Sequence, residues 1–208
     1  MIDSPRRPNA TRRVKPVTAL LKLLLTLVTL ALAGALALVF LGEPLDDIEG
    51  RESGAGGANG DLLERAQAAI DAGLAFQATE AEINRHIQAV LEAREADGFE
   101  LFSSFEGLWV RLGERGFDLI FERDFLGLDS TVAARIVIET SDSGYRIDVQ
   151  GGRFGRLLVP RGALSLIRDG LESAGKVFLP EKDVLSRSGE LTISPRQLRL
   201  EPIAKPAR

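Results

Sequence analysis

Between Gly107 and Phe125 the sequence reads GLWVRLGERGFDLIFERDF. On both sides of the central GERG, apolar and polar side chains alternate with the period of two that puts successive residues on opposite faces of a strand. The stretch therefore predicts two antiparallel strands joined by a turn at residues 113–116, with one apolar face. The residues of that face are Leu108, Val110, Leu112, Phe117, Leu119, Phe121 and Phe125.

The same alternation continues through two further strands. A third strand carries apolar residues on one face, and a fourth follows a turn at residues 141–144. Gly151-Gly152 predicts a bulge or bend in the fourth strand. The result is an antiparallel meander whose further apolar positions are Leu128, Val132, Ala134, Ile136, Ile138, Tyr145, Ile147 and Val149.

Two helices are predicted before the meander. Asp61 is the N-cap of the first, with Glu64 three residues later and Gly73 as its stop. The second opens on a capping box, in which the Thr79 hydroxyl bonds the amide of Glu82 and the Glu82 carboxylate reaches back. The apolar stripes have helical spacing and contain Leu63, Ala66, Ile70 and Leu74, then Ile83, Ile87, Val90 and Leu91.

After the meander, Pro160 is placed as the first residue of another long helix. A closing hairpin follows, with its turn at residues 194–197. The sequence therefore predicts an α+β domain over residues 61–203, in which a curved antiparallel sheet of about six strands packs on two long helices. The stripe of the later helix consists of Ala163, Leu164, Ile167, Leu171 and Ala174.

A long stretch without charge precedes this domain. From Leu23 to Leu41 the sequence reads LLLTLVTLALAGALALVFL, which is 19 residues of mostly Leu, Ala and Val. As a helix it is roughly 28 Å long, close to the hydrocarbon thickness of a bilayer. We predict a transmembrane helix over residues 17–41. The alternative, a buried helix of a soluble protein, is disfavoured by the length of the apolar run.

The two flanks of this stretch differ in charge. The first 41 residues carry six Lys and Arg and one acid, whereas the rest of the chain carries 20 basic and 29 acidic residues. The positive-inside rule places residues 1–16 in the cytoplasm and the C-terminal domain in the periplasm or outside the cell, on a single-pass cell-membrane protein. A cleaved signal peptide is the alternative, since Ala35-Leu36-Ala37 is an A-x-A pattern, although the apolar run continues to Leu41.

Two segments are predicted to lie outside the folded parts. Residues 42–60 are rich in Gly and charge and predict a linker, because such a composition buries too little apolar surface for a core. Residues 204–208 are predicted to form a tail.

The composition excludes several kinds of site. The chain has no Cys, which rules out disulfides, thiolate catalysts, Cys-ligated zinc and a lipoprotein anchor. His86 is the only histidine, so one chain cannot supply a multi-His metal site, and it flanks the apolar stripe of its helix. The acidic body disfavours nucleic acid as a partner. No nucleophile motif is present, and we expect no catalytic, cofactor-binding or metal site.

Large apolar side chains are concentrated around the first hairpin. Trp109 and Ile120 lie on the face opposite the apolar face defined above, so the hairpin is apolar on both sides. One interpretation is a core with a second element packed on the far side. The other is a groove between the sheet and the helices that receives an acyl chain. The candidate groove residues are Phe105, Leu108, Trp109, Phe117, Phe121, Ile136 and Leu164.

The order of these segments is shared with a known type of protein. An N-terminal span is followed by a helix that opens on TEAEIN (residues 79–84), a meander, the segment FGRLLVP (residues 154–160) and a closing hairpin. Over about residues 76–203, this arrangement resembles the small anchored extracytoplasmic proteins of the YpmS-like type. More distantly it resembles tubular lipid-binding (TULIP) modules, in which a curved antiparallel sheet wraps a long helix. The resemblance implies binding of a lipid or other hydrophobic ligand at the cell envelope, and it supplies no catalytic residues.

We therefore expect a non-catalytic, membrane-anchored module that binds a lipid or another apolar ligand. The alternative is a structural or assembly protein of the cell envelope that acts through protein–protein contacts. Such a protein would present an exposed apolar patch, here around Trp109 and Ile120. An enzyme is the class that the sequence favours least.

Overall fold

The computed structural model describes residues 16–51, 62–96, 106–125, 127–141, 144–162 and 178–203. The chain divides into two compact units, Met1–Ala37 and Leu38–Arg208. Helix α1 (Pro16–Phe40) contains a segment, Ala19–Phe40, that is long and apolar enough to cross a membrane, in agreement with the predicted span. Thr26 and Thr29 of α1 donate their hydroxyls to the carbonyl four residues earlier, at 2.9 Å, so these polar groups are paired within the helix.

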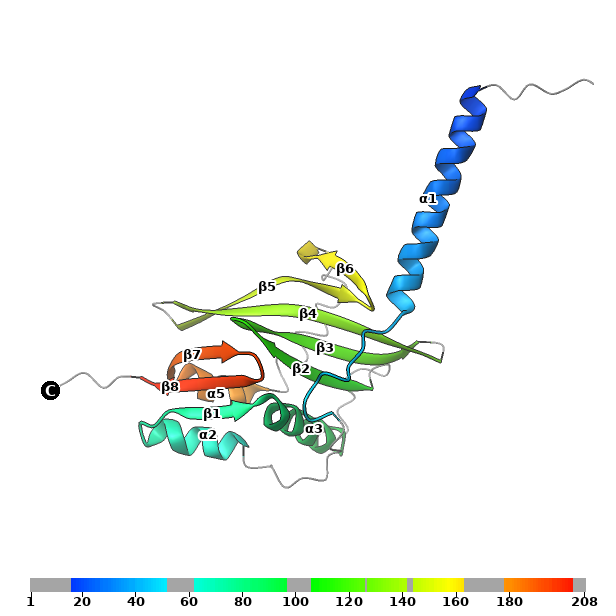
Figure 1. Ribbon diagram of the computed structural model, residues 1–208. Helices are drawn as coiled ribbons and strands as arrows, with labels where there is room; N and C mark the ends of the chain where they lie inside the picture. The colour runs from blue at the N-terminus through cyan, green and yellow to red at the C-terminus, as the bar shows by residue number, and fades with distance from the viewer. Residues whose placement is uncertain are drawn as a thin grey trace, which may run out of the picture. The chain divides into compact units, whose positions relative to one another are not determined.

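A five-stranded antiparallel sheet forms one layer of the second unit (Figure 1). Its strands follow one another in chain order, which confirms the predicted meander. Pairing places Leu108 opposite Phe121, and Phe117 opposite Ile136, so the apolar residues of neighbouring strands share one face, called the inner face. The strands are β2 (Gly107–Gly113), β3 (Gly116–Phe125), β4 (Leu128–Ser141), β5 (Gly144–Phe154) and β6 (Leu157–Pro160).

A β-bulge interrupts the pairing of β4 with β5. Arg135 pairs with Gly151, but the next residue, Ile136, pairs with Val149, so Gln150 is the extra residue. This confirms the irregularity predicted beside Gly151-Gly152. A bulge increases the local twist and bends the strand.

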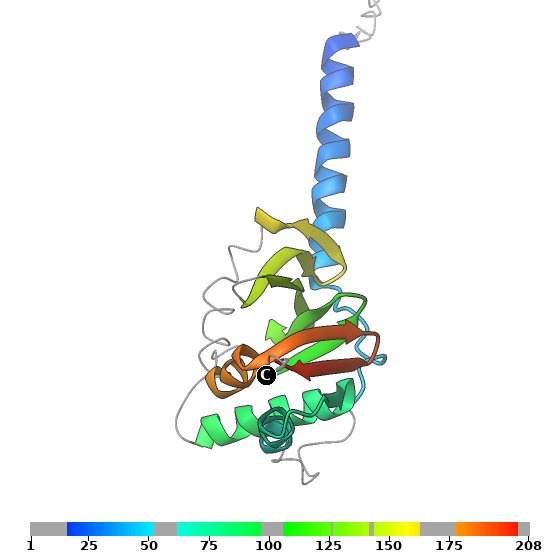
Figure 2. The same cartoon turned by 90° about the vertical axis from the view of Figure 1, so that its left-hand side faces the viewer.

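A second antiparallel sheet has three strands in the order β1-β8-β7. These strands are β1 (Phe76–Thr79), β7 (Ser188–Ser194) and β8 (Gln197–Pro202). Its apolar face consists of two cross-strand rows, Phe76–Leu200–Leu191 and Ala78–Leu198–Ile193. Figure 2 shows this sheet against one face of the five-stranded sheet, and side chains of both sheets meet in one core.

The predicted single sheet of about six strands is therefore wrong, because the described residues form eight strands in two sheets. Two strands escaped prediction. β1 has only four residues, too few for alternation to be recognised, and it pairs with β8 from the other end of the domain. β6 was predicted as the approach to a helix starting at Pro160. It is an edge strand that ends at this proline, where the missing amide is tolerated.

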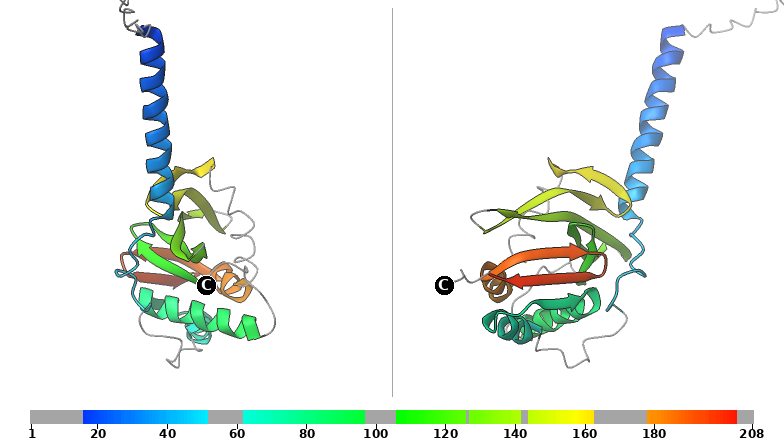
Figure 3. Two further views of the ribbon diagram at one scale, coloured as in Figure 1. Left: turned by 90° about the vertical axis from the view of Figure 1, so that its right-hand side faces the viewer. Right: turned by 60° about the vertical axis from the view of Figure 1, so that its left-hand side comes forward.

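Three helices complete the described part of the domain: α2 (Leu62–Asp71), α3 (Glu80–Ala96) and α5 (Leu179–Ser186). α2 and α3 match the two helices predicted before the meander, and both lie beside β1 (Figure 3). The prediction of two long helices is not matched, since α3 is the only described helix of the domain with more than ten residues. The stripe predicted after Pro160 falls on residues 163–177, outside the described residues.

The predicted capping box opens α3. The Glu82 amide donates to Thr79 Oγ1 at 3.3 Å, and the Thr79 amide donates to the Glu82 carboxylate at 2.9 Å. This backbone hydrogen bond from Thr79, assisted by Arg65, outweighs burial and lowers the pKa of Glu82.

We expect Glu82→Ala to lower the free energy of unfolding at neutral pH by about 0.5–2 kcal/mol, the usual worth of a helix cap. Because the folded-state pKa is lowered, the contribution is complete above about pH 4.3, the ordinary glutamate pKa, and is lost as the pH falls through the folded value. Urea unfolding monitored by the fluorescence of Trp109, the single tryptophan, measures it. Glu92→Ala, at an exposed position on α3, is the control. A difference independent of pH would contradict the expectation.

Helix α3 also covers the free edge of β2 with polar side chains. Glu80, Asn84 and Gln88 lie on one stripe of the helix, four residues apart. The Asn84 amide group accepts from the Val110 amide at 2.7 Å and donates to the Val110 carbonyl at 2.8 Å. Glu80 accepts from the Leu112 amide at 2.7 Å, and Gln88 donates to another β2 carbonyl at 2.8 Å. The edge backbone is thereby closed to pairing with another chain.

The residues that follow α1 pack on the outer face of the five-stranded sheet. Leu45 and Ile48 are buried against Ile120 and Ala133, with Trp109 beside them. Composition predicts a linker here, and the described start of that segment carries these two buried side chains. They explain why the first hairpin is apolar on both faces: the inner face meets the core, and the outer face meets this segment.

Candidate functional site: an apolar cavity

A cavity of about 490 Å³ lies between the inner face of the five-stranded sheet and the layer formed by the three-stranded sheet with α2, α3 and α5. Protein interiors are close-packed and leave few voids larger than a water molecule. A volume in the hundreds of cubic ångströms is instead typical of ligand pockets. The cavity is therefore the first candidate for a binding site.

The walls of the cavity are almost entirely apolar. Of the described residues that line it, all are apolar except His86, Glu181 and Lys182. The lining ranges from Leu108, which is completely buried, to Ile147, which is 64% exposed, so the cavity reaches the surface beside Ile147. Such a site can hold an apolar chain away from water, and the gain is roughly proportional to the area buried.

His86 and Glu181 form the polar corner of this cavity. His86 Nε2 lies 2.8 Å from Glu181 Oε1, and this contact joins α3 to α5. His86 is 8% exposed. Its Nδ1 atom and the Oε2 atom of Glu181 are both buried, and neither has a hydrogen-bond partner among the described residues. These two atoms are the unpaired buried polar groups of the described residues that line the cavity.

Four of the residues predicted to line a groove lie on the inner face. Leu108, Phe117 and Ile136 line the cavity. Phe121 belongs to the adjoining core cluster, where it is 1% exposed. The alternation of the strands was sufficient to find them, because all four lie on one face of the meander.

The other three predicted residues do not line the described cavity. Trp109 lies on the outer face of the sheet, beside Leu45 and Ile48, and its Nε1–H donates to Glu122 at 3.0 Å. Phe105 and Leu164 lie outside the described residues.

Sequence reasoning missed the opposite wall of the cavity. Ala66 of α2 was placed on an apolar stripe, but nothing in the sequence showed which surface that stripe would meet. Phe76, Val184 and Glu181 belong to β1 and α5, which were not predicted. Four- and eight-residue elements are too short for a periodic signal, so only their packing reveals them.

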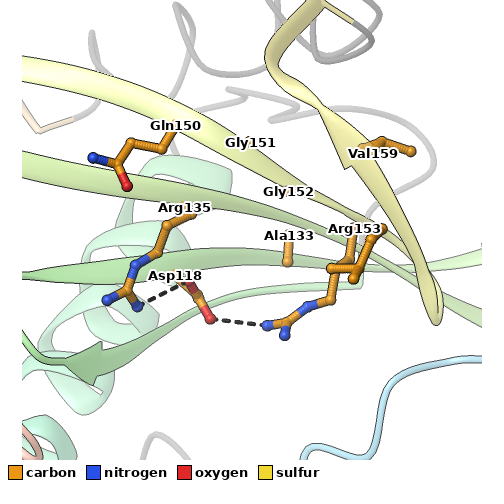
Figure 4. Close-up of a pocket in the computed structure, with 9 residues that line it drawn as sticks. Asp118, Ala133, Arg135, Gln150, Gly151, Gly152, Arg153 and Val159 are labelled. Carbon is orange, nitrogen blue, oxygen red and sulfur yellow. Dashed lines mark hydrogen bonds and ion pairs between the residues drawn. The ribbon is translucent and has the colours of Figure 1, made fainter.

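A second pocket, of about 390 Å³, lies on the outer face of the sheet. Figure 4 shows Asp118 between two guanidinium groups, those of Arg135 at 3.2 Å and Arg153 at 2.8 Å. Arg153 also contacts Glu43 at 2.9 Å, and Glu43 contacts Arg111 at 2.6 Å. The charges that line this pocket are thus paired with one another, and the network fastens the segment after α1 to the sheet.

Arg111 links this network to a further acid on the same segment. Its guanidinium contacts Asp47 at 2.8 Å. Burial opposes the charge of Arg111, but the hydrogen bond and charge of Glu43, together with Asp47, outweigh burial and raise the pKa of Arg111. The ion pairs therefore persist at every pH at which the acids are ionised.

The described part of the chain contains no group of three or more His, Asp or Glu side chains placed to hold a metal ion. No known protein-family model matches this sequence, and no curated protein is significantly similar to it. The resemblance to YpmS-like and TULIP proteins therefore stays a prediction.

Proposed function

We propose that this protein is a membrane-anchored, extracytoplasmic module that binds a lipid or another apolar ligand and catalyses no reaction. The cavity is the observation that carries the proposal, because its volume and its apolar walls suit a hydrocarbon chain. α1 would be the anchor. The basic residues before it and the acidic residues after it favour a domain on the outer side of the membrane.

Anchoring and ligand binding support each other in this proposal. Each methylene moved from water into the cavity contributes about 0.8 kcal/mol, so affinity grows with chain length. Molecules with such chains are concentrated in a bilayer. A domain attached to the membrane through α1 would meet them at a high local concentration.

If the protein were instead an envelope assembly protein, we would expect an exposed apolar patch at Trp109 and Ile120. Ile120 is completely buried, with Leu45 and Ile48 packed over it. That surface is thus covered within the chain, and we keep the apolar ligand as the proposal.

The test uses the full-length chain in lipid nanodiscs and an alkyl probe that carries a diazirine. After irradiation, peptide mass spectrometry is expected to find adducts on cavity-lining residues such as Phe117, Leu119 and Val184. Labelling confined to α1 would contradict the proposal, because α1 is the part in contact with bilayer lipid.

A matched pair of substitutions on α2 makes this test specific. Ala66 is buried and lines the cavity, whereas Ala68 is exposed on the same helix. We expect Ala66→Phe to lower cavity labelling at least about fivefold, because admitting both the new ring and a ligand costs about 1–3 kcal/mol. Ala68→Phe is expected to leave the labelling unchanged. Equal labelling of both variants would place the ligand elsewhere.

A further inference from the structure

We propose that the cavity selects an apolar chain that ends in an uncharged, hydroxyl-bearing head group, which His86 and Glu181 bind. The inference rests on the proposed function and specifies the class of ligand. Long-chain alcohols and monoacylglycerols have this chemistry, whereas alkanes and fatty acids lack it.

Two unpaired atoms point to a polar head group. His86 Nδ1 and Glu181 Oε2 are buried, belong to residues that line an otherwise apolar cavity and have no hydrogen-bond partner among the described residues. Buried polar groups in folded proteins are almost always hydrogen-bonded. His86 Nδ1 lies on the opposite side of the imidazole ring from Nε2, the atom that contacts Glu181 at 2.8 Å, so the two unpaired atoms offer separate positions to the hydroxyl groups of a ligand.

The donors and acceptors at this corner suit a hydroxyl group. Glu181 Oε2 can only accept a hydrogen bond while the carboxylate is ionised. With Nε2–H donated to Glu181, His86 Nδ1 accepts in a neutral ring and donates in a charged one. A hydroxyl group can pair with either atom, because it donates to Glu181 Oε2 or to the Nδ1 of a neutral ring, and it accepts from the Nδ1–H of a charged ring.

The charge at this corner disfavours a carboxylate head group. A carboxylate head group would be placed beside the carboxylate of Glu181, and like charges at close range repel most strongly where water is scarce. Lys182 lines the cavity but is exposed to solvent, which screens its charge. The corner therefore disfavours a fatty acid relative to an alcohol of the same length.

The experiment measures competition against the diazirine probe in the full-length chain in nanodiscs. The competitors are dodecane, dodecanol and laurate, each expressed as its measured mole fraction in the nanodisc lipid. We expect dodecanol to displace the probe at about tenfold lower mole fraction than dodecane, the effect of one additional buried hydrogen bond. Laurate is expected to compete more weakly than dodecanol.

Substitutions at the corner assign the preference to these residues. We expect Glu181→Met combined with His86→Phe to bring dodecanol to within about twofold of dodecane, because both hydrogen-bonding atoms are then lost. Glu181→Gln removes the charge and is expected to improve competition by laurate. Asp183→Asn, at an exposed position two residues along α5, is the control and should change nothing. Trp109 fluorescence verifies that each variant remains folded.

The possible failures are distinguishable. If the probe labels no cavity residue, the proposed function itself is wrong. If the probe labels the cavity but dodecane and dodecanol displace it equally, the apolar site stands and the head-group inference is overturned. A preference for dodecanol that survives Glu181→Met combined with His86→Phe would also overturn it, because other groups would then bind the hydroxyl.

Discussion

Asn84→Leu is expected to lower the free energy of unfolding by about 3 kcal/mol or more, since each buried polar group left unpaired costs about 1–3 kcal/mol. Asn84 is completely buried between α3 and β2. Its side chain bonds the amide and the carbonyl of Val110, at 2.7 and 2.8 Å, and the Glu49 carbonyl at 2.9 Å. Leucine has a similar size, fills the site and keeps water from replacing the lost bonds.

Urea unfolding of the full-length chain, monitored by Trp109 fluorescence, measures this loss of stability. Trp109 lies on β2, the strand that loses the hydrogen bonds. Gln88→Leu is the matched comparison, because Gln88 lies one turn further along α3 and bonds a single carbonyl, that of Leu108. We expect this second variant to lose about 1 kcal/mol. If the two variants were equally stable, the hydrogen bonds of Asn84 would not hold the β2 edge.

Gly155→Ala is expected to cost about 2–5 kcal/mol through two separate effects. Gly155 has φ +54°, and an L-residue with a side chain pays about 1–2 kcal/mol in this region. A Cβ atom there would also lie against the carbonyl oxygens of Leu38, Val39 and Leu41. Moving those backbone atoms adds about 1–3 kcal/mol.

Hydrogen exchange of the full-length chain locates the damage. The Arg156 amide donates to the Leu38 carbonyl at 2.9 Å, and the Glu43 amide donates to Thr131 Oγ1 at 3.0 Å. We expect both amides to exchange faster in Gly155→Ala. Gly73→Ala measures the cost of a positive φ alone, because Gly73 has φ +73° and open space around its Cβ position. Equal effects of the two substitutions would exclude the close approach as a cause.

Elements with a local signal were predicted well. The capping box of α3 needs only Thr79 and Glu82, three residues apart, and both of its hydrogen bonds are present. The hairpins of the meander and the bulge beside Gly151 likewise depend on side-chain alternation and turn residues close in sequence. For the same reason Leu108, Phe117 and Ile136 were correctly placed on one face of a sheet.

Elements whose partners are distant in sequence were missed. β1 is stabilised by β8, and α5 by packing against α2, so neither carries its own signal. The burial of Leu45 and Ile48 was missed for another reason. Residues 42–60 were predicted as a linker from their Gly-rich composition as a whole, although the segment contains these two apolar side chains. They pack on Ile120 and Ala133 of the sheet.

The sequence by itself determined the apolar helix, the charge difference across it and the alternation that gives the meander an apolar inner face. These features follow from composition and from periods of two and 3.6 residues, which act between near neighbours. Only the tertiary structure decided that a second sheet and two short helices stand opposite that face and leave a cavity. The same packing brings His86 and Glu181 together from positions 95 residues apart. Burial of an apolar face is favourable against any apolar partner of suitable shape. The packing of the whole chain therefore decides which apolar faces meet.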